Sequence, residues 1–118
     1  YHTGRHAHGE EAIYVVDGEG FTIVDGHKYE WAKGSVLWMP FGSEHQHFNR
    51  GEKAARYFSG SALHLEHYVG IGKLEQLETK GSTERPVEVP VSPDGLNEKG
   101  RAFSFVENMD EVKIFLGF

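Results

Sequence analysis

The sequence predicts an all-β fold, an antiparallel barrel or sandwich built from short strands. Its first half alternates runs rich in β-branched and aromatic residues with glycine-containing turns. The turn signals are Asp17-Gly18, Asp25-Gly26 and Lys33-Gly34. An Asp-Gly pair between two such runs is typical of a hairpin, because both residues tolerate the positive φ that a two-residue turn needs. Repeated hairpins of this kind predict antiparallel pairing.

Six strands are expected in the first half of the chain, each bounded by turn residues. They cover residues 11–16, 21–24, 27–32, 36–39, 45–49 and 54–59. The turns between them cover residues 17–20, 25–26, 33–34, 40–42 and 50–53. Ahead of these strands, His6 and His8 lie two apart in a further extended segment, which places both side chains on one face.

The second half of the chain carries weaker signals. A short helix is expected at residues 73–78, where the leucine spacing is partly helical. Residues 80–100 contain three prolines and predict a loop, with an extended piece at 87–91. Strands are expected at residues 101–106 and 112–118. These two strands would complete the barrel edge, replace strands upstream of the histidines, or pair with a neighbouring chain.

Length and composition fit one domain of 118 residues, with a barrel core in residues 1–62 and a C-terminal extension in residues 63–118. The net charge of −6, without clustered Lys or Arg, argues against a nucleic-acid partner. No apolar run is long enough for a membrane span. The absence of cysteine excludes disulfides and thiolate sites and fits a cytoplasmic location. Because the sequence begins at Tyr1 rather than methionine, we expect a processed or fragmentary chain.

Two histidine-containing stretches point to a metal site. In the first, His6 and His8 share a strand face and are followed by Glu10 and Glu11. In the second, a strand, a turn and another strand bring two more histidines, His45 and His47, to one face. Imidazole and carboxylate donors of this kind suit Fe, Mn, Co, Ni, Cu or Zn. The pattern therefore predicts a divalent metal site.

Together the two stretches resemble the cupin family. The second family motif, G-x5-P-x-G-x2-H-x3-N, is matched at every spacing by Gly34, Pro40, Gly42, His45 and Asn49. The first motif, with its His-x-His, glutamate and final glycine, is matched by His6, His8, Glu11 and Gly18. The resemblance implies an antiparallel cupin β-barrel, also described as a double-stranded β-helix or jelly roll, with a metal held by His6, His8, Glu11 and His45.

The short spacing between His8 and Glu11 leaves the carboxylate ligand open. On a continuous strand Glu10 shares a face with His8, and Glu11 points the other way. Either Gly9 allows a bulge that resets the alternation, or Glu10 is the ligand, or the three histidines bind the metal alone. A further reading takes His6 as the second histidine and loses a ligand. We favour Glu11, because its distance to the final glycine fits the motif.

The stretch around the second histidine pair is similar to that of gentisate and hydroxynaphthoate ring-cleaving dioxygenases. That likeness implies an Fe(II) dioxygenase acting on a small hydroxylated aromatic acid, with His47 as a hydrogen-bond or proton donor. His47 could instead only orient its strand. Such a substrate would need a cationic clamp, and Arg5, Arg50 and Arg56 are the candidates.

Two other functions remain open alongside the dioxygenase. One is a redox-neutral isomerase or lyase that uses the metal as a Lewis acid. The other is a non-catalytic domain that binds a metal or a small ligand. A small barrel with free strand edges is also expected to form a homodimer or larger assembly.

Overall fold

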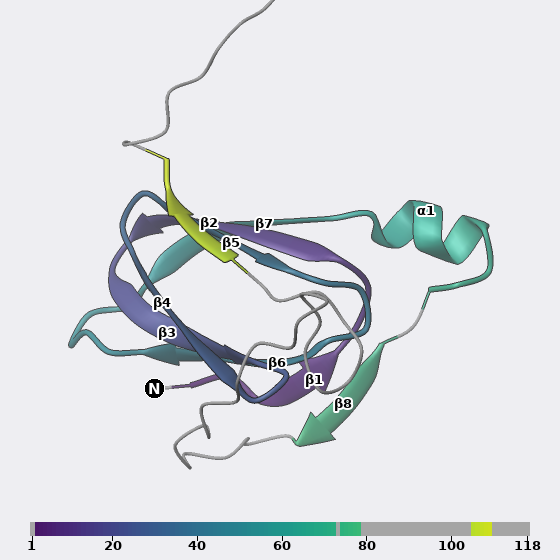
Figure 1. Ribbon diagram of the computed structural model, residues 1–118, viewed down its shortest axis with the longest axis horizontal. Helices are drawn as coiled ribbons and strands as arrows, with labels where there is room; N and C mark the ends of the chain where they lie inside the picture. The colour runs from purple at the N-terminus through teal and green to yellow at the C-terminus, as the bar shows by residue number, and fades with distance from the viewer. Residues whose placement is uncertain (1, 73, 79–104, 110–118) are drawn as a thin grey trace, which may run out of the picture.

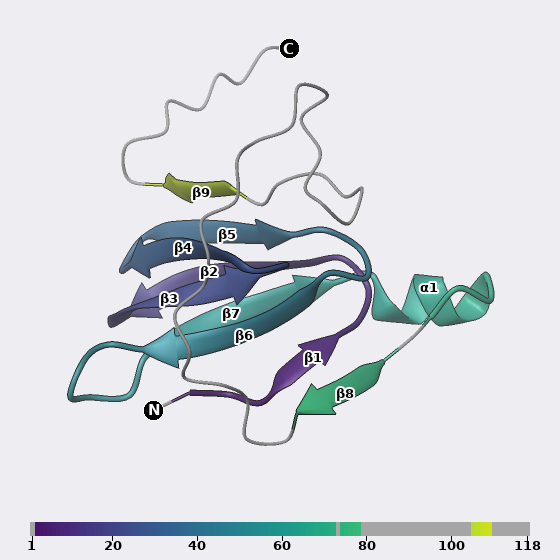
Figure 2. The same ribbon diagram turned by 60° about the horizontal axis from the view of Figure 1, so that its bottom comes forward.

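The computed structural model describes residues 2–72, 74–78 and 105–109 and shows two antiparallel sheets packed face to face (Figures 1 and 2). The five-stranded sheet has the order β4 (His27–Ala32), β3 (Glu19–Val24), β6 (Glu44–Asn49), β1 (Arg5–Ala7) and β8 (Glu75–Glu78). The four-stranded sheet has the order β7 (Arg56–Ser61), β2 (Glu11–Asp17), β5 (Ser35–Met39) and β9 (Phe105–Asn108). The predicted all-β barrel architecture is confirmed.

The turns that the sequence predicts join these strands. Asp25 and Gly26 have φ values of 48° and 87° and connect β3 to β4 as a two-residue hairpin. Positive φ at both positions is the geometry that matches the twist of the flanking strands. The turn at residues 17–20 is shorter than expected, because β2 runs to Asp17 and β3 begins at Glu19.

The core lies between the two sheets and follows the alternation along the strands. Buried side chains from the four-stranded sheet are Ile13, Val15, Leu37 and Met39. They pack against two side chains of the other sheet, Val24 and Trp31. The opposite faces of β2 and β5 are more exposed, as expected where only one face of a strand meets the core.

The prediction of a helix at residues 73–78 is wrong. The helix of the described chain is α1 (Leu63–Tyr68), and β8 (Glu75–Glu78) occupies the predicted position. Gly70, at φ 82°, follows α1 and turns the chain away from helical geometry. Backbone pairing of β8 with β1 then outweighs local helix propensity. In the part of the chain described here, no helix has the length and apolarity needed to cross a membrane.

Only part of the C-terminal strand predictions can be compared with the structure, because they extend beyond the described residues. β9 (Phe105–Asn108) overlaps the expected strand at residues 101–106 and pairs with β5, at an edge of the four-stranded sheet. The predictions for residues 80–100 and 112–118 lie outside the described residues. The expected strand at residues 54–59 is displaced by two positions, since β7 covers Arg56–Ser61.

Gly20 in β3 is expected to tolerate no side chain. A Cβ placed there would lie 2.1 Å from the Phe48 carbonyl oxygen and 2.5 Å from the Trp31 ring. Gly20→Ala should therefore lower the free energy of unfolding by about 1–3 kcal/mol. Chemical denaturation measures this loss. The control is Gly60→Ala, because a Cβ at Gly60 would have its nearest neighbour at 3.9 Å. Equal stability of the two variants would contradict this close packing.

Candidate metal centre

Three histidines converge where β1 meets β6. His6 lies in β1 directly opposite His45 in β6, and His8 follows the end of β1. One ring nitrogen from each lies within 4.8 Å of the other two. His45 is the most buried, with 1% of its surface exposed. Antiparallel pairing of the two motif segments thus builds the cluster.

Each of the three rings has its Nδ1 atom next to a backbone carbonyl oxygen. The Nδ1 to oxygen distances are 3.2 Å from His6 to Gly4, 2.9 Å from His8 to Gly9 and 3.0 Å from His45 to Ser43. A carbonyl only accepts, so each Nδ1 carries a proton, and in the neutral ring Nε2 then presents a lone pair. Backbone contacts of this kind fix the tautomer and orientation of metal-ligating histidines.

Glu11 adds a carboxylate to the cluster. Its Oε2 atom lies 2.9 Å from His8 Nε2 and 3.6 Å from His45 Nε2, while Ser59 donates a hydrogen bond to Oε1. Burial raises the pKa of Glu11, but interactions with His45, Ser59 and His8 outweigh burial and lower the pKa to about 2. Glu11 is therefore an anion at neutral pH.

A bend at Gly9 explains why Glu11 rather than Glu10 faces the histidines. β1 ends before the bend and β2 begins after it, so strand alternation does not carry across. The amide of Gly42 donates to the His8 carbonyl at 2.7 Å and ties the bend to the turn before β6. Glu10 is exposed. The structure brings Glu11 to the cluster together with both histidines of the His-x-His pair.

The donor atoms of His8, His45 and Glu11 have spacings close to those of ligands on a single transition-metal ion, and a ring nitrogen of His6 lies within 4.8 Å of those of His8 and His45. Two ligands about 2.1 Å from one ion, at angles of about 90–109°, lie about 3.0–3.4 Å apart. The His8 and His45 Nε2 atoms are 3.2 Å apart, and the Glu11 distances lie on either side of this range. Burial, with the neighbouring His45, lowers the pKa of His6 and favours the neutral ring that ligates. When the rings are neutral, their converging Nε2 lone pairs repel one another, and a cation between them removes that repulsion.

His47 lies beside the cluster and makes different contacts. Its Nδ1 atom is 2.8 Å from the Thr22 hydroxyl oxygen, which accepts a hydrogen bond from the Trp31 indole at 2.9 Å. The Thr22 hydroxyl accepts from the indole and donates to Nδ1 of His47. Nδ1 is then unprotonated, and the ring proton of His47 lies on Nε2. Burial, reinforced by His45, lowers the pKa of His47 to about 4. His47 is therefore a neutral hydrogen-bond donor at neutral pH.

Three cavities lie next to these residues. One, of about 360 Å³, reaches His8 from the side of Glu44 and Glu75. The other two lie closer to the rest of the cluster and to His47. The larger, of about 420 Å³, is lined by His2, Thr3, Trp31, His47, Asn49, Glu52, Ala54, Ala55 and Tyr57. The smaller, of about 230 Å³, is lined by His8, Gly9, Glu11, Ser59, Ser61, Leu63, Glu66, His67 and Leu74. The larger cavity therefore reaches His47, and the smaller one reaches His8 and Glu11.

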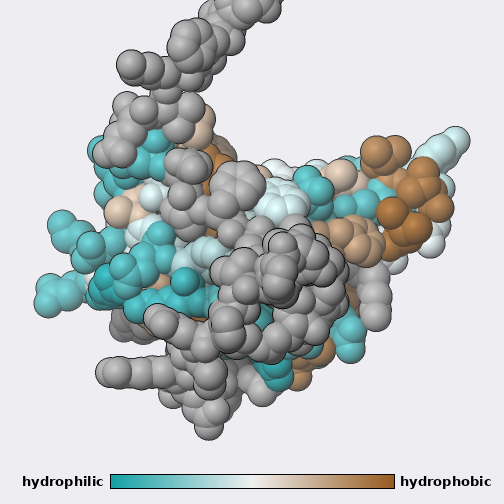
Figure 3. Space-filling view, in the orientation of Figure 1, coloured by the Kyte–Doolittle hydropathy of each residue, from teal (hydrophilic) through white to brown (hydrophobic). Residues whose placement is uncertain are grey.

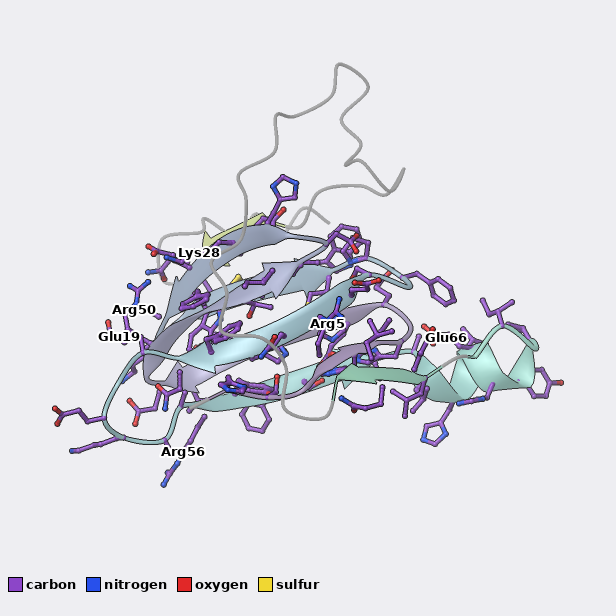
Figure 4. All side chains as sticks on the ribbon, turned by 90° about the horizontal axis from the view of Figure 1, so that it is seen from below. Arg5, Glu19, Lys28, Arg50, Arg56 and Glu66 are labelled. Atoms are coloured by element: carbon purple, nitrogen blue, oxygen red, sulfur yellow. The ribbon has the colours of Figure 1, made fainter. Side chains whose placement is uncertain are left out.

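The expected arginine clamp is not formed by the three candidates. Arg5 pairs with Glu44 at 2.9 Å, and Arg50 pairs with Glu30 at 2.7 Å. Arg56 is exposed and projects away from the barrel (Figure 4). None of the three is among the described residues that line either cavity.

Sequence reasoning missed several residues around the centre. Tyr57 and Ser59 lie two apart on β7 and contribute to the cavities, while Phe58 between them is 72% exposed. The period of two along this strand was the available signal. Burial and the Glu11 carboxylate raise the pKa of Tyr57, so its hydroxyl keeps its proton. Thr22, which orients His47, carried no sequence signal.

Comparison with known proteins agrees with this architecture. A family model described as Cupin domain matches residues 2–61. No curated protein matches the sequence. The fold is similar to that of salicylate 1,2-dioxygenase from Pseudaminobacter salicylatoxidans, with 22% identity and a TM-score of 0.60 over 76% of this chain and 25% of that one. Adducts of that enzyme with gentisate give 22% identity and a TM-score of 0.62 over 73% of this chain and 24% of the other.

The present chain therefore spans about a quarter of the length of these dioxygenases. At such identity the likeness concerns the fold. The family model, by contrast, covers half of the sequence and includes both histidine stretches. The chain belongs to the cupin family.

Proposed function

We propose that this chain is the catalytic barrel of a metal-dependent cupin enzyme, an Fe(II) dioxygenase acting on a small hydroxylated aromatic acid. The observation that carries the proposal is the convergence of one ring nitrogen from each of three histidines and one carboxylate beside a buried, neutral His47. In this proposal His6, His8, His45 and Glu11 hold the metal. Three histidines and a carboxylate leave coordination positions free for other ligands.

The metal would supply oxygen activation and bind substrate oxygens, and the protein would supply position and protons. The larger cavity has aromatic walls from Trp31 and Tyr57, which suit a planar ring. His47 would donate a hydrogen bond from Nε2 to a substrate oxygen, and the buried Thr22 hydroxyl would hold the ring in that tautomer.

One observation favours a second candidate, a redox-neutral isomerase or lyase. Neither cavity has an arginine or lysine among its described lining residues, although a carboxylate substrate usually meets a cation. A neutral substrate bound to the metal as a Lewis acid would need no such clamp.

Oxygen consumption tests the proposed reaction. The Fe(II)-loaded protein is expected to consume oxygen with a member of a panel of dihydroxybenzoates and hydroxynaphthoates. His47→Ala should lower the rate by about 100-fold or more while leaving the iron content unchanged. Turnover that persists without oxygen would favour the isomerase or lyase. Saturable ligand binding with no turnover would contradict both enzymatic candidates and support a binding role.

We also propose that the chain self-associates. Apolar side chains gather on and after α1, at the side of the barrel shown on the right in Figure 3. The exposed members are Leu63, Leu65, Tyr68, Val69, Ile71 and Leu74. β7 lies at the edge of its sheet and is exposed along its length. Both features are typical of surfaces that pair with another chain.

A further inference from the structure

Glu66 is a buried carboxylate that the proposed metal site does not use. It is the buried residue of α1, with 6% of its surface exposed, while its helical neighbours face solvent. Its Oε2 atom is enclosed and receives no hydrogen bond from the described residues. A buried carboxylate oxygen without a donor is unfavourable, so the geometry implies a missing partner.

The carboxylate is packed against the bend that separates the metal-site histidines from Glu11. A Cβ at Gly9 would lie 1.8 Å from Glu66 Oε2 and 2.2 Å from Oε1. Glycine is therefore what allows the carboxylate to reach the backbone at this point. Figure 4 shows Glu66 where α1 meets the barrel. The contact places the charge next to the loop that carries His8.

Glu66 also lines the smaller cavity, which it shares with His8 and Glu11. Glu66 gives the cavity a negative charge besides that of Glu11, which the proposed metal would engage. The described lining residues include no arginine or lysine, and the histidines among them are His8 and His67. Glu11 has Ser59 and the histidines as partners, whereas Glu66 Oε2 has no described donor. The cavity is therefore complementary to a cationic group that donates hydrogen bonds.

We propose that the smaller cavity binds an organic ammonium group, with the Glu66 carboxylate as its acceptor. The inference deepens the proposed function in one respect: it rests on the metal centre being the site that receives substrate, and it gives the proposed aromatic acid an amino substituent that enters this cavity while its carboxylate stays outside. A charge-assisted bond to a buried carboxylate would fix the orientation of the ligand. A carboxylate group on the ligand would be repelled from this cavity.

Calorimetric titration of the purified protein with three matched probes tests the site directly. The probes are benzylammonium, benzyl alcohol and benzoate at pH 7. Benzylammonium should bind at least about tenfold more tightly than benzyl alcohol, and benzoate more weakly than either. Glu66→Gln, which keeps the shape of the side chain, should remove that preference. The matched variant Glu10→Gln removes an exposed charge next to Gly9 in sequence and should change the preference for benzylammonium by less than about twofold.

A second variant distinguishes the charge of Glu66 from the position of its carboxylate. Gly9→Ala keeps Glu66 but forces its carboxylate to move, so benzylammonium binding should weaken while circular dichroism shows a folded protein. The proposal is overturned if benzylammonium does not bind with a Kd below about 10 mM, or if it binds Glu66→Gln as tightly as the wild type. These titrations use no metal and no oxygen. A protein that selects the ammonium probe but consumes no oxygen would therefore contradict the proposed reaction and leave this site intact.

Discussion

His45→Ala is expected to abolish stoichiometric metal binding. His45 is the most buried of the three histidines, and its Nδ1 atom is fixed by the Ser43 carbonyl. Its Nε2 atom lies 3.2 Å from the corresponding atom of His8, as expected for two ligands of one ion, so its loss removes a donor from the cluster. Loss of an outer hydrogen-bond partner alone costs about 10–100-fold in metal affinity, and loss of a ligand should exceed about 100-fold.

Inductively coupled plasma mass spectrometry of gently purified protein, with metal titration of the stripped protein, measures this effect. His64→Ala is the matched control, because His64 lies on the exposed face of α1 outside the cluster. The control should retain wild-type metal content. Equal metal content in His45→Ala and wild type would show that the ion binds elsewhere.

Glu11→Gln is expected to weaken metal binding by about 100-fold or more, because it removes a charged ligand rather than an outer partner. The amide keeps the size of the side chain and can still accept the hydrogen bond from Ser59. It lacks the negative charge, which the pKa of about 2 shows to be stabilised by its surroundings. The change should therefore reduce affinity without unfolding the barrel.

Glu10→Gln tests which of the two carboxylates, Glu10 or Glu11, is the metal ligand. Glu10 is exposed, and the bend at Gly9 places it away from the histidines, so its replacement should change affinity by less than about twofold. Competition with a chromogenic chelator measures both variants. A larger effect for Glu10→Gln than for Glu11→Gln would identify Glu10 as the ligand and contradict the geometry described here.

The elements that the sequence predicts well are those encoded locally. The Asp25-Gly26 hairpin depends on residues that tolerate positive φ, and both residues adopt it. The two histidine stretches form short antiparallel strands that meet in register, with His6 opposite His45. In an antiparallel barrel, the motif spacing alone predicts that these two stretches lie side by side.

The features that sequence could not decide depend on contacts between distant segments. Strand alternation favours Glu10 over Glu11, but the bend at Gly9, held by the Gly42 amide, interrupts the strand. Residues 75–78 have helix-forming side chains, yet they form β8 because β1 offers an edge to pair with. The position of Glu66 depends on how α1 packs against that same bend.

The most direct test of the proposed centre is anomalous diffraction from crystals of the Fe(II)-loaded protein, recorded above and below the iron absorption edge. One anomalous peak is expected within about 2.0–2.3 Å of the Nε2 atoms of His6, His8 and His45 and of a Glu11 carboxylate oxygen. An ordered cluster with no peak, or a peak held by other side chains, would contradict the proposal that these residues form the metal centre.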